Sequence, residues 1–111
     1  MSERSVKVLL EDIQDCLDKI FDYTHGLDES QFKGNSMVVD AVLRNIEVMG
    51  EAASKLPDDF IREHPDVEWH KIIGMRNRLI HGYFGVSLQL VWQTIRHNLP
   101  ELQVKLGGLS K

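Results

Sequence analysis

The chain has 111 residues, 42% hydrophobic and 27% charged, with a net charge of −4. Such a composition excludes an intrinsically disordered protein, and we expect one domain over residues 1–111. A single cysteine excludes an intrachain disulfide framework. No apolar run is long enough to cross a bilayer, and the start does not resemble a signal peptide, so we expect a cytoplasmic protein with no membrane partner.

The first half of the chain predicts two long amphipathic helices. Apolar residues recur at steps of three and four from Ser5 to about Thr24, with acidic residues mostly between them. Cys16 lies in this stretch, where a buried, inert thiol is expected. A turn and a short element around Phe32 follow. The second long helix should begin near Asn35 or Ser36, both of which are good N-cap residues, and end before Pro57.

Prolines and cap residues also divide the second half. One or two helical turns are expected between Pro57 and Pro65, and Asp66 can cap a helix that runs toward Gly82. Ser87 can cap a final helix, which Pro100 should kink or divide. Residues 106–111 are expected to form a frayed tail. Because no alternating strand pattern occurs, we predict an all-α fold, a compact bundle of four to five helices.

Charge is distributed unevenly along the chain. Residues 1–68 contain seven Lys and Arg against sixteen Asp and Glu, whereas residues 69–111 contain six against one. No acidic residue occurs between Trp69 and Pro100. This pattern suggests an acidic scaffold that carries a local anion-binding surface, although chance clustering in a short chain would produce it as well.

Several kinds of reaction site are not indicated. The five histidines and the cysteine show no metal-ligand spacing, and no glycine-rich phosphate loop or nucleophile elbow is present. We therefore expect no metal and no cofactor. Glu47 and Glu51 are one helical turn apart, but such a pair usually lies on a solvated helix face.

The stretch "RNRLIHGYF", residues 76–84, holds the remaining candidates. At roughly 100° per residue, Asn77 and His81 share one helical face, while Arg76 and Tyr83 share another, about 140° from His81. One interpretation is structural: Arg76 caps carbonyls or pairs with an acid on a neighbouring helix such as Glu47, and His81 interacts favourably with a helix C-terminus.

The other interpretation is catalytic. Histidine titrates near neutral pH and can move a proton, and arginine offers a fork of donors to a phosphate. Together they suffice to cleave RNA through attack of a ribose 2′-OH on the adjacent phosphorus, without a metal. One helix places only one histidine well, so a symmetric dimer that brings two copies of His81 and Arg76 together would supply both base and acid.

Beyond this motif, long segments of the chain resemble the HepT-like toxins of the HEPN nuclease superfamily. Arg76, four residues, His81, one residue and Tyr83 match that signature, with Asn77 as the polar residue after the arginine. The resemblance continues in the early segments "EDI" and "YTHGL" and in "AVLRNIEVMGEAASKLPDDF", "WHKIIGMRNRLIHGYFGV" and "VWQTIRHNLPEL".

This resemblance implies an all-helical, HEPN-like homodimer or higher oligomer that acts as a metal-independent endoribonuclease toxin. Arg76 and His81 would be catalytic and Asn77 supporting. The implied partners are RNA and an MntA-like minimal nucleotidyltransferase antitoxin, which would silence the toxin by AMPylation of Tyr83. Two alternatives remain: a non-catalytic helical partner or nucleotide- and substrate-binding subunit of a nucleotidyltransferase, and a structural module in which Arg76 only holds helices together.

Overall fold

A computed structural model describes residues 5–81 and 87–109, and within these residues the chain is helical with no strand. The prediction of an all-α bundle is confirmed. The elements are α1 (Val6–Thr24), α2 (Glu29–Lys33), α3 (Ser36–Ser54), α4 (Asp58–Glu63), α5 (Trp69–His81), α6 (Leu88–Gln93), the π-helical η2 (Thr94–Asn98) and α7 (Leu99–Leu109).

Side-chain caps fix the starts of several helices as the sequence predicts. The Asn35 side chain accepts a hydrogen bond of 3.1 Å from the Val38 amide at the start of α3, and Ser87 accepts one of 3.2 Å from the Leu90 amide at the start of α6. Each cap satisfies an amide that has no partner inside its helix. The predicted caps Asn35 and Ser87 are therefore confirmed.

The start of α5 differs from the prediction. Asp66 lies in a turn rather than at the N-cap, and α5 begins at Trp69. The Val67 amide donates to the His64 carbonyl at 3.3 Å, and the Trp69 indole nitrogen donates to the same carbonyl at 3.1 Å. Because Val67 and Trp69 are both buried, their side chains hold this turn against the core and delay the helix.

The C-terminal helical segment agrees with the prediction only in part. Its register changes just before Pro100, where the Leu99 amide donates to the Thr94 carbonyl five residues back, which is a π-helical bond. Proline lacks the amide that would continue an α-helical register, and the register changes before Pro100, but the chain stays helical from Leu88 to Leu109. The predicted tail is wrong in part, since α7 continues to Leu109 and Leu106 is fully buried.

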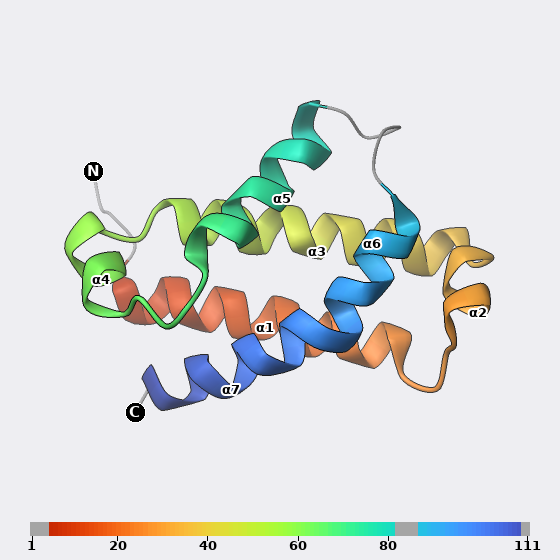
Figure 1. Cartoon of the computed structure of the whole chain (residues 1–111), viewed down its shortest axis with the longest axis horizontal. Coiled ribbons are helices and arrows are strands. Elements are labelled where there is room, and N and C mark those ends of the chain that lie inside the picture. The colour runs from red at the N-terminus through yellow and green to blue at the C-terminus, as the bar shows by residue number, and fades with distance from the viewer. Residues whose placement is uncertain (1–4, 82–86, 110–111) are drawn as a thin grey trace.

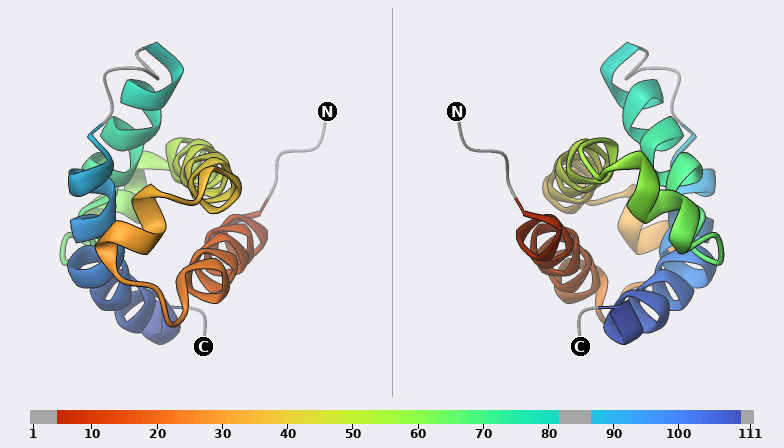
Figure 2. Two further views of the ribbon diagram at one scale, coloured as in Figure 1. Left: turned by 90° about the vertical axis from the view of Figure 1, so that its right-hand side faces the viewer. Right: turned by 90° about the vertical axis from the view of Figure 1, so that its left-hand side faces the viewer.

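The long helices surround one hydrophobic core. Figure 1 shows α1 and α3 side by side and antiparallel, with α5 on α3 and α7 along α1. Seen along the long axis, the helices surround a central space, with α6 and α7 across it from α1 and α3 (Figure 2). One cluster of buried hydrophobic side chains forms the core. The fully buried members of this core are Ile13, Leu17, Ile20, Phe32, Val42, Ala53 and Leu106.

Cys16 belongs to this core. Its side chain is buried, and burial raises the pKa of the thiol from 9.0 to about 11. The thiolate, which is the reactive form, is therefore scarce at neutral pH. The interpretation of Cys16 as an inert thiol is confirmed. Of the helices that the structure describes, none has the length and apolar character that spanning a membrane requires.

Candidate active site on helix α5

The motif helix α5 approaches α3 very closely at one glycine. A Cβ atom added at Gly50 would lie 2.3 Å from the Cβ of Arg76 and 3.1 Å from the Ile72 carbonyl oxygen. The first contact is far shorter than van der Waals distance, and the second is tighter than most Cβ contacts. Gly50 therefore allows the aliphatic stem of Arg76 to lie directly across the α3 backbone.

Arg76 is anchored on α3 by an ion pair. Its Nη1 donates to Oε1 of Glu51 at 2.6 Å, and its side chain is only 15% exposed. The structural interpretation of Arg76 anticipated such a pair but named Glu47, whose carboxylate instead lies 3.9 Å from Nη1 of Arg44. Glu51 follows Gly50 directly, so the close approach at Gly50 brings Arg76 to Glu51.

One nitrogen of this guanidinium stays without a hydrogen bond. Nε of Arg76 is buried and has no partner among the residues that the structure describes. A buried polar donor without a partner is costly, and such groups mark positions where a ligand or a water molecule can bind. The ion pair thus leaves Arg76 with unused donor capacity.

A cavity of about 360 Å³ lies on the α1 and α3 side of Arg76. Three carboxylates, those of Asp12, Glu47 and Glu51, line it together with the cations Arg44, Lys55 and Arg76. A phosphate that entered from this side would meet like charges close to the guanidinium. Acidic and basic side chains are equal in number around this cavity, and Glu51 already occupies one side of the guanidinium.

The other motif residues are Asn77, His81 and Tyr83. Asn77 is exposed on α5, and His81 is the last residue of that helix. Tyr83 lies outside the described residues, so the expectation that it shares a helix face with Arg76 stays a prediction. Glu51, which the sequence suggested as part of a solvated pair, is 49% exposed and holds Arg76. The only sequence signal that Glu51 could pair with Arg76 was Gly50, a small residue directly before it.

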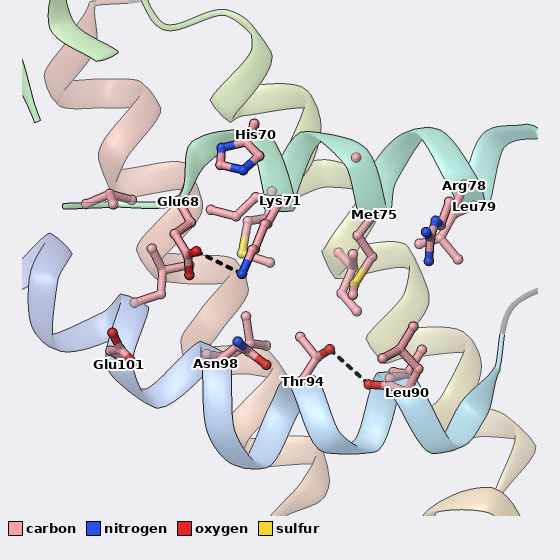
Figure 3. A pocket seen from close by; sticks show the side chains of 18 of the residues that line it. Glu68, His70, Lys71, Met75, Arg78, Leu79, Leu90, Thr94, Asn98 and Glu101 are labelled. Carbon is pink, nitrogen blue, oxygen red and sulfur yellow. Dashed lines mark hydrogen bonds and ion pairs between the residues drawn. The ribbon is translucent and has the colours of Figure 1, made fainter. Parts of the chain in front are cut away.

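A larger groove of about 880 Å³ lies on the other side of α5 (Figure 3). Its walls come from α5 and from the α6–η2–α7 segment. Lys71 pairs with Glu68 at 2.8 Å, and this hydrogen bond lowers the pKa of the Glu68 carboxyl. The sequence did not indicate this groove, because the angle and spacing between α5 and the α6–η2–α7 segment are set by packing rather than by residue order.

Metal-ligand groups are not found in the described part of the chain, where no three His, Cys, Asp or Glu side chains are arranged to hold an ion. The described groups around Arg76 are the carboxylates of Asp12, Glu47 and Glu51 and the cations Arg44 and Lys55. Of these groups, the cations can bind a phosphodiester.

Comparison with known proteins shows the family to which this sequence belongs. A family model described as "Ribonuclease HepT-like" matches residues 13–107, which include the whole Arg76 to Tyr83 motif. This chain belongs to the HepT-like ribonuclease family. The resemblance drawn from the sequence is thereby confirmed. No solved structure is similar enough to the chain to count as a match.

Named relatives of this HepT-like chain extend over nearly its full length. "Probable ribonuclease HepT" of Thermococcus cleftensis is 37% identical over 109 residues, which cover 98% of this chain and 99% of that protein. "Putative RNase MJ0125" of Methanocaldococcus jannaschii is 38% identical over 111 residues, covering 100% of this chain and 96% of that protein. The anchored Arg76, its partner Glu51 and the groove all lie within the aligned part of the HepT-like chain.

Proposed function

We propose that this HepT-like protein is a metal-independent endoribonuclease that acts in the cytoplasm. The observation that carries the proposal is the family match over residues 13–107, which contains the complete Arg76, His81 and Tyr83 motif. The anchored guanidinium of Arg76 and the absence of acidic residues between Trp69 and Pro100 support the same conclusion, because both favour binding of a phosphate.

In the proposed reaction, His81 of one subunit removes the proton from a ribose 2′-OH. The 2′-oxygen attacks the adjacent phosphorus, the bond from phosphorus to the 5′-oxygen breaks, and a protonated histidine gives a proton to the leaving 5′-oxygen. Arg76 stabilises the negative charge that develops on the phosphoryl oxygens, and Asn77 supports its position. The products are a 2′,3′-cyclic phosphate and a free 5′-OH.

The site is proposed to be shared between two copies of the chain. Arg76 and His81 are five residues apart, which places them about 140° apart around a helix. One copy of α5 therefore presents them on different faces. A symmetric dimer with two copies of α5 at one cleft would provide one histidine as base and the second as acid.

End-group analysis of cleaved RNA tests this proposal. We expect the purified protein to cut single-stranded RNA in excess chelator and to leave 2′,3′-cyclic phosphates and 5′-hydroxyls, because 2′-OH attack needs no metal. The ends are identified by their resistance to phosphatase before acid treatment and by direct labelling with polynucleotide kinase. Absence of cleavage, cleavage only with added metal, or 3′-OH ends would each contradict the proposal and favour a non-catalytic helical partner.

We further propose that the protein is the toxin of a toxin–antitoxin pair. Its antitoxin would be an MntA-like minimal nucleotidyltransferase, which transfers AMP from ATP to Tyr83 with release of pyrophosphate. An added AMP places a phosphate close in sequence to Arg76 and His81, where it would occupy the cationic site and repel RNA.

Mass spectrometry tests this regulation. We expect incubation with an MntA-like minimal nucleotidyltransferase, together with ATP and Mg²⁺, to add mass in units of AMP and to stop RNA cleavage. The Tyr83→Phe variant should gain no mass, whereas the control Tyr23→Phe should be modified like the wild type, since Tyr23 lies on α1. Wild type without a mass gain, or modification that persists in Tyr83→Phe, would refute Tyr83 as the target.

A further inference from the structure

The groove beside α5 has the size of a ligand site and lies next to the proposed active site. Its volume of about 880 Å³ is within the range of sites that bind small molecules and nucleotides. α5 forms one wall, and α6, η2 and α7 form the other wall (Figure 3). Ile46 and Met49 of α3 also line the groove. The groove is separate from the smaller cavity at Glu51.

The middle of the groove is apolar. Met75 and Leu79 from α5 lie across it from Leu90 of α6 (Figure 3), and the buried Val91 of α6 also lines it. Leu90 is 43% exposed although it lies beside the core. Burial of such a surface by a flat apolar group is favourable, and the polarisable thioether of Met75 suits contact with an aromatic ring. The groove can therefore receive a planar base between aliphatic side chains.

Charges are arranged differently at the two ends. At one end, Lys71 pairs with Glu68 at 2.8 Å and Lys105 with Glu101 at 2.9 Å, so these charges are balanced. At the other end, Arg78 is exposed and has no ion pair or hydrogen bond with any described residue. An anion is therefore attracted to the Arg78 end.

The position of Arg78 on α5 places this end of the groove close to the proposed reaction site. Arg78 precedes His81 by three residues, close to one helical turn, so a phosphate at Arg78 would be a near neighbour of the phosphate cleaved at the motif. Asn98 lines the groove from η2, and its amide offers both a donor and an acceptor to the edge of a base.

We infer that this groove binds an unpaired base of the RNA substrate, adjacent to the cleaved phosphodiester, with the phosphate of that nucleotide at Arg78. The inference rests on the proposed nuclease function. A base must leave its duplex partner to enter between Met75 and Leu90, so the groove selects single-stranded RNA. Asn98 contributes base preference at this position.

Binding of an RNA that cannot be cut tests the groove separately from cleavage. The probe is a fluorescent, fully 2′-O-methylated oligonucleotide, measured by anisotropy as a single strand and as a duplex. We expect Arg78→Ala and Leu90→Glu each to weaken single-strand binding by about tenfold, the first by loss of a phosphate contact and the second by repulsion inside the groove. Duplex binding should be weaker in the wild type and insensitive to Leu90→Glu.

Matched controls lie outside the groove. Val104→Glu adds the same charge at a 78% exposed position on α7, and Arg62→Ala removes an exposed arginine on α4; both should bind like the wild type. Equal affinity of Leu90→Glu and Val104→Glu, equal affinity for single strand and duplex, or absence of binding by the wild type would overturn the groove proposal.

The two proposals fail differently. Cleavage of unmodified RNA by the wild type, together with normal probe binding by Arg78→Ala and Leu90→Glu, would remove the groove and leave the nuclease. Probe binding that depends on Arg78 and Leu90, without any cleavage, would support the groove as an RNA site and remove the nuclease.

Discussion

Replacement of His81 by alanine is expected to lower the rate of RNA cleavage by about 10³-fold, within the range that a general acid and base contributes. Stability should change little, because His81 is the last residue of α5. The initial cleavage rate of a labelled single-stranded RNA measures the effect. Circular dichroism and size-exclusion chromatography show whether fold and assembly remain intact.

His97→Ala is the matched control for this variant. His97 is an exposed histidine of η2, and it lines neither the groove beside α5 nor the cavity at Glu51. Its replacement should leave the cleavage rate unchanged. If His81→Ala retains a rate within a few fold of the wild type, His81 is not the acid and base, and the proposed reaction is wrong.

The second large effect is expected at Arg76, where a catalytic and a structural role can be separated. Arg76→Lys keeps the positive charge but removes the fork that can hold Glu51 and a phosphate together, so we expect the cleavage rate to fall by about 10²-fold. Glu51→Gln leaves the guanidinium, only 15% exposed, without a carboxylate and should destabilise the protein by about 1–2 kcal/mol.

The comparison of these two variants decides the role of Arg76. Rates are measured per folded molecule, with the folded fraction taken from urea unfolding. A catalytic Arg76 predicts that Arg76→Lys loses far more rate than stability, while Glu51→Gln loses less than about tenfold in rate. If the rate per folded molecule of both variants equals that of the wild type, Arg76 is a structural anchor and not a catalytic residue.

The parts of the fold that could be predicted from the sequence depend on interactions between residues close together in the chain. The caps at Asn35 and Ser87 depend on bonds to residues three positions ahead, so their effect lies within the local sequence. Pro100 lacks an amide, and the α-helical register is interrupted by a π-helical turn just before it. Asp66 has the same capping capacity, but the buried side chains of Val67 and Trp69 kept it in a turn.

The sequence by itself determined the all-α fold, the helix that carries Arg76 and His81, and the acid-free segment around them, since helical period and charge follow directly from residue order. Only the tertiary structure decided that Glu51 rather than Glu47 holds Arg76, that α7 is packed at Leu106, and that a groove lies beside α5. Helical period gives the face of a residue within its own helix. The partner across the interface depends on how closely two helices approach, and here Gly50 sets that distance.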